Sequence, residues 1–430
     1  MSLARWATIG TAMTLLATAC APWVPSEPSV TVAPAAARHQ TGDVVLVGTG
    51  DGLAALDWAA GRLVYRAPHA VAAPDGSRLV ATTGTGEARS LDVLDARTGA
   101  RQGSVPVPAG VAASVVSPDG RLVALAPPRP DTAGWQPTGR ERTQLVVTEL
   151  SSAVAPRVFD LDGNYEPDAF STDDQHLFVL EYQPPQAPDR YRVRQLDLAT
   201  GVVSGVGSRS KVAVPEEEMR GTRRMHVLAP DRTTLYTLYT HQPDHLHARD
   251  LAAGRTVAGG DVHAFVHVLN LAQGWAYCLD LPQPFGLGPA SAHALALSPD
   301  GQTLYVADRS SGAVAVADTT QLVLRATTNV GPDPRADVGL AAAQAGPDGT
   351  LYLAGASEVL ALEPRTQTVG RRLPVPGVAR GLGVGADGRR LYLGLGDRVV
   401  ALEATTGAEL DSIAFPGAER IELVSPAVAR

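Results

Sequence analysis

The stretch that decides the fold is APDGSRLVA, residues 73–81, in which a small residue and Pro-Asp-Gly precede a hydrophobic strand. Six further versions follow: SPDGRLVAL at Ser117, STDDQHLFVL at Ser171, APDRTTLYTL at Ala229, SPDGQTLYVA at Ser298, GPDGTLYLA at Gly346 and GADGRRLYLG at Gly385. The turn aspartates are 39 to 69 residues apart, at Asp75, Asp119, Asp173, Asp231, Asp300, Asp348 and Asp387. Strand repeats of roughly 40–50 residues are typical of a β-propeller, so the sequence predicts this all-β fold.

Each repeat contains further strands besides the one after the Asp turn. A short apolar strand precedes the turn, as in residues 112–116, and another strand follows, as in residues 193–198. A turn such as Thr200-Gly201 then leads to one more strand. We therefore expect four-stranded antiparallel blades, with strands a to d joined by tight turns.

The two ends of the chain complete one another. Residues 43–67 contain VVLVGTG, GLAALD and RLVYRA, which match strands b, c and d, whereas residues 419–426 (ERIELVSP) match strand a alone. A composite blade made from both ends would close the ring and remove an exposed sheet edge. The sequence thus predicts eight blades, seven continuous and one composite. The alternative is seven blades, if the N-terminal strands pack in another way.

The N-terminal residues have the pattern of an export signal. Arg5 supplies a positive charge, and residues 6–19 form an apolar stretch of secretory length that is short for a membrane span. The stretch ends in Ala-Thr-Ala-Cys20, which resembles the bacterial lipoprotein box, although an alanine stands where leucine is preferred. The resemblance implies that Cys20 is acylated; ordinary signal-peptidase cleavage is the alternative. We expect a signal peptide over residues 1–19, a lipid-anchored flexible tether over 20–42 and the propeller over 43–430.

Charge argues against one class of binding partner, and the cysteine content argues against an intramolecular disulfide. The chain has 36 basic and 44 acidic residues and a net charge of −8, which argues against nucleic acid. Cys20 and Cys278 are the only cysteines, so lipidation of the first leaves the second without an intramolecular disulfide partner. We expect an exported monomer, anchored by acyl chains to the outer face of the bacterial cell membrane.

One repeat carries a family resemblance. Residues 304–319, LYVADRSSGAVAVADT, resemble the YVTN-type repeat of bacterial propellers, within the wider group of WD-repeat-like proteins. The resemblance is clearest over residues 291–330 and 378–417. It implies blade architecture and no catalytic residue, because Asp-Gly and Thr-Gly serve turns. Residues 402–407 are similar to a phrase of eight-bladed quinone dehydrogenases, but the five tryptophans lack the period of that family's docking tryptophans.

The sequence favours a binding module over an enzyme. Nucleophile elbow, zinc-protease histidine pair and phosphate-binding glycine loop are all missing at local spacing. Since propeller active sites are assembled from several blades, the alternative is a lactonase-type hydrolase with its active site at the mouth of the central channel. The expected partner is a protein or a small anionic ligand.

Strand alternation assigns the loops to two faces. The a–b and c–d turns lie on one side, which we call the turn face, and the b–c loops and d-to-a crossovers lie on the other, the crossover face. The long insertions are all b–c loops of three consecutive blades: residues 126–143, 183–190 and 239–263. Long loops in a compact fold are often functional, so we expect a binding wall on the crossover face.

Charged residues are expected around the channel at the start of the a strands. Counting five residues back from the small residue of the Asp turns leads to Glu166, Arg224, His293 and Arg380, and the C-terminal strand supplies Arg420. This mainly basic channel rim suits a carboxylate or other anionic ligand, which guanidinium groups bind well. The alternative is that the arginines form salt bridges between blades or point to solvent.

Two metal sites are alternatives to the expectation that no cofactor is bound. Oxygen ligands for Ca²⁺ alternate along Asp160, Asp162, Asn164, Glu166 and Asp168, although the glycine and the last ligand depart from an EF-hand loop. A histidine group of His241, His245, His247 and His263 has the ligand type for Zn²⁺ or Cu²⁺. A turn explains the first pattern equally, and a polar surface loop explains the second.

Overall fold

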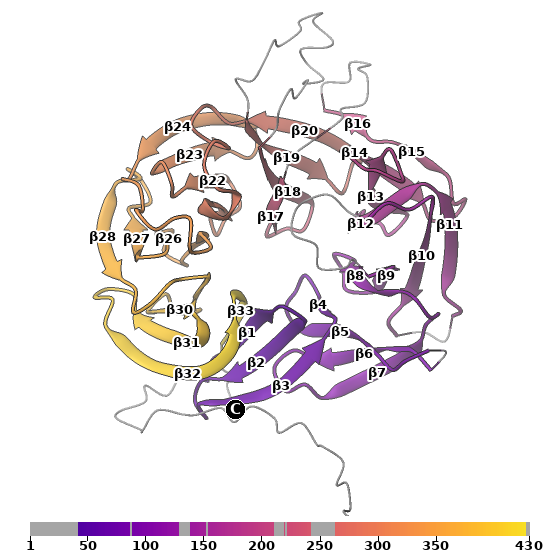
Figure 1. Ribbon diagram of the computed structural model, residues 1–430, viewed down its shortest axis with the longest axis horizontal. Helices are drawn as coiled ribbons and strands as arrows, with labels where there is room; N and C mark the ends of the chain where they lie inside the picture. The colour runs from indigo at the N-terminus through magenta and orange to yellow at the C-terminus, as the bar shows by residue number, and fades with distance from the viewer. Residues whose placement is uncertain are drawn as a thin grey trace, which may run out of the picture.

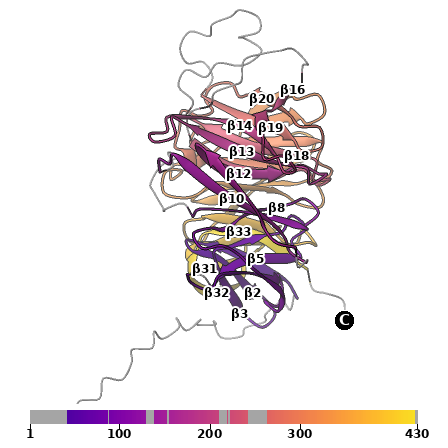
Figure 2. The ribbon, with the colours of Figure 1, turned by 90° about the vertical axis from the view of Figure 1, so that its right-hand side faces the viewer.

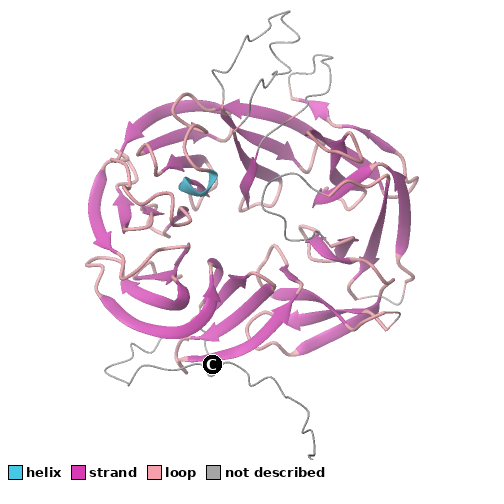
Figure 3. Cartoon of the chain, viewed as in Figure 1, coloured by secondary structure: helices cyan, strands magenta, loops and turns pink. Residues whose placement is uncertain are grey.

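The chain folds into a ring of sheets around a central axis (Figure 1). The computed structural model describes residues 42–86, 88–128, 138–151, 154–209, 219, 222–241 and 263–426, without the side chains of 223 and 224. These residues form eight sheets, and their regular structure is strand except for the short helix η1, Ala290–Ala292 (Figure 3). Figure 2 shows the ring from its edge. No helix in the described segments is long and apolar enough to cross a bilayer.

The first four continuous blades follow one another in sequence order. Blade 1 contains β4 (Ala70–Ala72), β5 (Arg78–Thr83), β6 (Ser90–Asp95) and β7 (Arg101–Pro106). Blade 2 contains β8 (Ala112–Val116), β9 (Leu122–Ala126), β10 (Arg142–Glu149) and β11 (Arg157–Asp162). Blade 3 contains β12 (Asn164–Phe170), β13 (His176–Gln183), β14 (Arg190–Asp197) and β15 (Val203–Gly205). Blade 4 contains β17 (Thr222–Leu228), β18 (Thr234–Thr240), β19 (Ala264–Asn270) and β20 (Trp275–Asp280).

The remaining blades complete the ring. Blade 5 contains β21 (His293–Leu297), β22 (Thr303–Asp308), β23 (Ala313–Asp318) and β24 (Val323–Asn329). Blade 6 contains β25 (Ala342–Ala345), β26 (Leu351–Ala354), β27 (Glu358–Leu362) and β28 (Val369–Pro374). Blade 7 contains β29 (Gly381–Val384), β30 (Arg390–Gly394), β31 (Gly396–Glu403) and β32 (Glu409–Ala418). Blade 8 contains β33 (Arg420–Ser425), β1 (Val44–Thr49), β2 (Gly52–Asp57) and β3 (Arg62–Pro68).

Blade 8 is the composite blade that the sequence predicts. Its strand order is β3-β2-β1-β33, with Val45 opposite Val424 and Leu46 opposite Leu423. Arg97, from the c–d turn of blade 1, donates to the carbonyl oxygens of both Gly42 and Pro426 and so joins the two ends of the propeller. The eight-bladed prediction is confirmed, and the seven-bladed alternative is wrong.

The Asp turn forms because its side chains replace missing backbone hydrogen bonds. In blade 2, the Asp119 carboxylate accepts from the Ser117 hydroxyl at 2.6 Å and from the Arg121 amide at 2.9 Å. Gly120 adopts a φ of 73°, which glycine reaches without strain. In this blade Ser117, Asp119 and Gly120 thus complete the turn, and the apolar strand that follows is fully buried.

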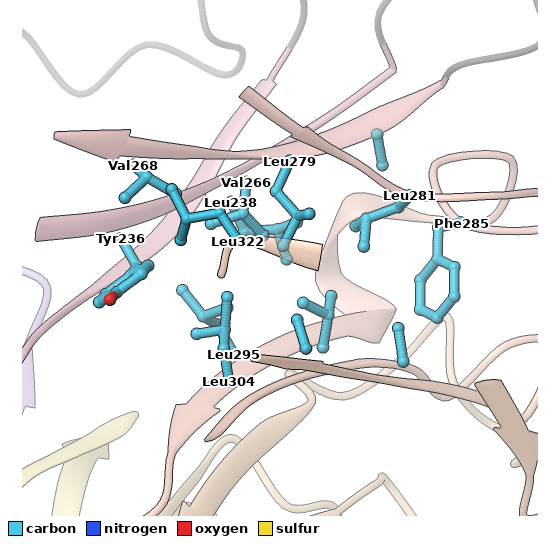
Figure 4. Close-up of a cluster of buried hydrophobic side chains, with 14 of the residues drawn as sticks. Tyr236, Leu238, Val266, Val268, Leu279, Leu281, Phe285, Leu295, Leu304 and Leu322 are labelled. Carbon is cyan, nitrogen blue, oxygen red and sulfur yellow. The ribbon is translucent and has the colours of Figure 1, made fainter. Parts of the chain in front are cut away.

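The core lies between neighbouring blades. One buried cluster joins Leu238 and Val266 of blade 4 to Leu295, Leu304 and Leu322 of blade 5 (Figure 4). Burying a leucine side chain stabilises the fold by about 1.5–3 kcal/mol, so each sheet is held mainly by its two neighbours. The a strands surround the ring's centre (Figure 1), and each contacts an a strand of a neighbouring blade, as β21 contacts β25 and β29 contacts β33.

Blade 4 carries an addition that the sequence does not predict. β16 (Gly207–Ser208) pairs in parallel with the outer strand β20. Just after it, Arg209 lies 5.8 Å from the ring centre of Trp275 and donates to the Thr320 carbonyl oxygen at 2.8 Å. The segment after blade 3 therefore contacts the outer sides of blades 4 and 5.

Candidate functional site

The antiparallel pairing divides the loops between two faces, as expected. In blade 5, β22 runs opposite to β21 and β23, so the a–b turn and the c–d turn share the turn face. The b–c turn and the crossovers share the crossover face. The two faces differ in how many of their polar side chains already form hydrogen bonds within their own turns.

The turn face is occupied by its own hydrogen bonds. The Asp300 carboxylate accepts from the Ser298 hydroxyl at 2.6 Å and from the Gln302 amide at 3.0 Å. These hydrogen bonds lower the pKa of Asp300. In the c–d turn of blade 1, burial acts to raise the pKa of Asp95, but hydrogen bonds from Thr98 and Arg97 hold it below its ordinary value. The carboxylates of Asp300 and Asp95 therefore accept hydrogen bonds within their own turns.

Two of the long b–c loops meet on the crossover face. The Arg140 amide, in the loop of blade 2, donates to the Pro185 carbonyl oxygen, in the loop of blade 3, at 2.8 Å. The Asn164 amide group, 2% exposed, donates to the carbonyl oxygens of Thr138 at 3.0 Å and of Pro185 at 3.2 Å. These loops, residues 126–143 and 183–190, are the loop wall. Residues 129–137 of the first loop and 242–262 of the third lie outside the described residues.

Three crossovers form a second feature of this face. The Ala341 amide donates to the Ser291 carbonyl oxygen at 2.8 Å, and the Leu340 amide donates to the Ala379 carbonyl oxygen at 3.1 Å. The crossovers at residues 281–292, 330–341 and 375–380 are thus hydrogen-bonded into one surface, which we call the crossover platform. Leu287 and Val338 project from it with 55% and 48% of their surface exposed.

His293 lies beneath this platform and fixes it. Its side chain is fully buried at the start of β21. Its Nε2 accepts from the Gly286 amide at 2.9 Å, and its Nδ1 is 3.0 Å from the Pro289 carbonyl oxygen, an obligate acceptor. His293 is therefore neutral with its proton on Nδ1, and both nitrogens hold the crossover rather than face the channel.

Arg309 is the largest fully buried side chain of the described residues, and it links blades 5 and 6. It donates to the Gly331 carbonyl oxygen at 3.0 Å and to Glu358 Oε1 at 3.3 Å. Burial lowers the pKa of Arg309, whereas the charges of Asp333 and Glu358 act to raise it. Asp333 accepts from the Ser357 hydroxyl at 2.8 Å and from the Ser357 amide at 3.2 Å. This buried cluster anchors the platform from below.

The other four channel-rim residues also lie within two residues of the start of an a strand, as expected, and two of them, Glu166 and Arg420, contact their own neighbours. The Tyr182 hydroxyl donates to Glu166 Oε2 at 2.5 Å. Arg420, 61% exposed at its side chain, donates through Nε to Glu422 Oε1 at 2.8 Å. Gly381, which follows Arg380, packs against the Arg420 backbone, since an added Cβ would be 2.7 Å from the Arg420 Cα, whereas the Arg380 side chain lies near Gly396. The side chain of Arg224 lies outside the described residues.

The residues of the metal hypotheses are distributed over several elements. Asp160 and Asp162 are exposed on β11, whereas Asn164, Glu166 and Asp168 belong to β12 of the next blade. Within the described segments, no three His, Cys, Asp or Glu side chains are grouped as metal ligands. The structure therefore does not gather the Ca²⁺ residues into one described site.

The histidine group is described only in part. His241 has Nδ1 at 3.0 Å from the Thr240 hydroxyl and Nε2 at 2.9 Å from the Gly288 carbonyl oxygen. The His263 carbonyl packs against Gly286, where an added Cβ would be 2.3 Å from its oxygen. His241 and His263 thus flank the platform. His245 and His247 lie outside the described residues, so the Zn²⁺ or Cu²⁺ site stays a prediction, as does acylation of Cys20.

A groove of about 850 Å³ opens at the outer side of the ring, away from the channel. It lies between the outer strand β7 and the c–d loop of blade 2, where Leu150, Val154 and Pro156 line it. This groove belongs to neither the loop wall nor the crossover platform.

The platform and its buried arginine are the features that sequence reasoning missed. The signal was present as two Pro- and Gly-rich runs between strands, LPQPFGLGPASA (residues 281–292) and VGPDPRADVGLA (residues 330–341). Arg309 stands in the YVTN-like stretch directly after β22, where the pattern indicates only a turn. A second charged residue directly after Asp308, the last residue of β22, was the available sign.

Comparison with known proteins supports the fold. No family model matches the chain, and no curated protein matches it. The solved structure of dihydro-heme d1 dehydrogenase NirN in complex with DHE is similar, with a TM-score of 0.52 and 17% identity over 92% of this chain and 77% of that chain. Apo AztD from Citrobacter koseri has a TM-score of 0.50 and 12% identity, covering 90% of this chain and all of that chain (100%).

A third similar structure is the periplasmic gluconolactonase PpgL of Pseudomonas aeruginosa, with a TM-score of 0.42 and 18% identity over 82% of this chain and 99% of that chain. At identities this low, a structural likeness shows a shared fold and not a shared activity. The chain is an eight-bladed β-propeller.

Proposed function

We propose that this propeller is an exported, lipid-anchored binding module that recognises a protein partner through its crossover face. The observation that carries the proposal is the crossover platform, a surface of three hydrogen-bonded crossovers from which Leu287 and Val338 project. Exposed apolar side chains on a well-ordered backbone are the usual anchors of protein interfaces. Among the described residues, the turn face exposes Val154 in the c–d loop of blade 2 but has no surface of hydrogen-bonded crossovers.

A protein partner is favoured over a small anionic ligand because three of the five channel-rim residues are already paired. His293 uses both ring nitrogens within the crossover, Arg420 faces Glu422, and Glu166 accepts from Tyr182. An anion would have to displace these contacts before it could bind. The lactonase-type alternative gains no specific observation from the described residues.

The position of the chain ends supports an outward-facing platform. Gly42, the first described residue, is held by Arg97 in a c–d turn, so the N-terminal segment joins the propeller at the turn face. Acylation of Cys20 would therefore tether the turn face to the membrane. The crossover face would be left accessible to partners in the extracytoplasmic space.

The test compares apolar residues of the two faces. Leu287→Glu with Val338→Glu should abolish co-purification of the native partner from detergent-solubilised membranes. The matched control is Val202→Glu with Val323→Glu, since these valines are 60% and 45% exposed and lie at the turn face. Loss of the partner in the control alone, or in neither variant, would contradict the proposal.

A further inference from the structure

Two of the Asp turns depart from the others in a way that costs conformational free energy. The residue after the turn aspartate has a positive φ in all seven continuous blades, between 57° and 84°. Glycine occupies this position in five blades, but Asp174 stands there in blade 3 (φ 57°) and Arg232 in blade 4 (φ 61°). Side chains disfavour this left-handed conformation, and such strain persists where the surroundings impose it.

The glycine turns show where a side chain at this position would point. An added Cβ would lie 2.5 Å from Leu423 Cδ2 at Gly76 and 2.6 Å from an Arg78 side-chain nitrogen at Gly120. It would lie 2.9 Å from Pro230 Cδ at Gly301. In these three turns, and at Gly388, the nearest atom belongs to the preceding blade, whereas at Gly349 it is Pro364 Cβ of the same blade, at 3.5 Å. In four of the five glycine turns, a residue other than glycine would thus be directed at a neighbouring blade.

Asp174 and Arg232 both use this direction to reach blade 2. Asp174, 6% exposed, accepts through Oδ2 from the Nε of Arg121 at 3.2 Å and from its terminal nitrogen at 2.7 Å. The same guanidinium contacts Glu149 Oε1 at 3.0 Å. Arg232 donates to the Pro118 carbonyl oxygen at 2.9 Å, two blades away. These charge-assisted contacts join blades 3 and 4 to blade 2 on the turn face.

Blades 2, 3 and 4 are also the three blades with the long b–c loops at their opposite ends. We infer that Asp174, Arg232, Arg121 and Pro118 form a turn-face clamp that holds these blades as one unit and thereby positions the described b–c loop residues, 138–143 and 183–190, at the opposite ends of blades 2 and 3. The backbone strain at two turns is offset by interblade contacts that glycine cannot make. The clamp goes beyond the proposed function, which rests on the crossover platform, and it is testable without a partner.

The experiment restores the glycine of the other blades in the full-length protein, as Asp174→Gly with Arg232→Gly. Amide hydrogen exchange is then followed by mass spectrometry without any partner present. We expect residues 138–151 and 176–197 to exchange at least ten-fold faster, while residues 281–297 and 330–345 of the platform exchange as in the parent protein. Unchanged exchange in all four segments, together with a raised unfolding midpoint from relief of strain, would overturn the clamp.

A second variant separates charge from backbone conformation. Asp174→Asn keeps a residue that tolerates positive φ but removes the ion pair with Arg121. We expect faster exchange in residues 176–197 of this variant, because a neutral amide binds the guanidinium more weakly. Exchange equal to that of the parent protein would refute the ion-pair basis of the clamp. Since neither readout involves a partner, failure of the clamp is distinguishable from failure of the proposed binding face.

Discussion

The buried cluster below the platform leads to the sharpest stability prediction, at Gly355. An alanine Cβ at this position would lie 2.2 Å from Asp333 Oδ2 and 3.1 Å from Arg309 Nε. The backbone of Gly355 has no positive φ, so the effect of Gly355→Ala comes from this collision alone. Asp333 must move. This movement weakens its two hydrogen bonds from Ser357 and its electrostatic attraction to the Arg309 guanidinium.

The expected cost follows from these contacts. A hydrogen bond to a charged group contributes about 1.5–3 kcal/mol, and Asp333 accepts two from Ser357. Because Asp333 is displaced and not deleted, we expect the free energy of unfolding to fall by about 2–3 kcal/mol, below the cost of full removal. Urea unfolding followed by tryptophan fluorescence should show a lower midpoint with an unchanged slope.

Gly103→Ala is the matched control, because its added Cβ would meet only the Leu150 carbonyl oxygen, at 3.9 Å. An alanine in a strand at a permissive position stabilises by about 0.4–1 kcal/mol, chiefly through the unfolded chain. The two variants should therefore shift the midpoint in opposite directions. If Gly355→Ala unfolds at the same urea concentration as Gly103→Ala, the cluster does not hold the platform.

Three further predictions follow from other parts of the fold. Hydrogen bonds from Ser298 and Gln302 lower the pKa of Asp300 in the folded state below its unfolded value of 3.8. The stabilisation from ionised Asp300 is therefore present above pH 3.8 and is lost as the pH falls further. Asp300→Asn should reduce the loss of unfolding free energy between pH 6 and pH 3, and a loss identical to that of the parent protein would contradict this account. His293→Ala should leave the Gly286 amide without its acceptor and increase proteolysis of the crossover at residues 281–292, with the cleavage sites identified by mass spectrometry; cleavage no faster than in the parent would show that the crossover holds without it. Deleting residues 420–430 should expose the β1 edge and give aggregates in size-exclusion chromatography. The control Arg97→Ala, which removes only the contact between the chain ends, should remain monomeric. A monomeric deletion variant would contradict closure of the ring by β33.

The fold was readable from the sequence because each blade repeats a local requirement. The turn aspartate accepts hydrogen bonds within its own turn, as Asp119 does from Ser117 and Arg121, so an aspartate recurs in all seven turns. The composite blade was predictable because three strands lacked an a strand at one end of the chain and a single a strand stood at the other. These signals depend only on neighbours in the sequence.

The site was less predictable because it depends on contacts between segments that are distant in the sequence. The register placed His293 at the start of an a strand, which is correct, but nothing nearby indicates that residues 281–292 fold over it. The meaning of Asp174 and Arg232 likewise depends on blade 2, more than 50 residues from the first of them in the sequence. The burial and the hydrogen-bond partners of such residues are set only when the blades pack into the closed ring.

The central claim, recognition through the crossover face, is tested most directly by site-specific photocrosslinking in intact cells. A photoreactive amino acid would replace Leu287 or Val338 on the crossover platform, and Val202 or Val323 on the turn face, in otherwise unchanged full-length protein. The account predicts a discrete crosslinked protein at the two platform positions and none at the two turn-face positions. A discrete adduct at the turn face with none at the platform would contradict it.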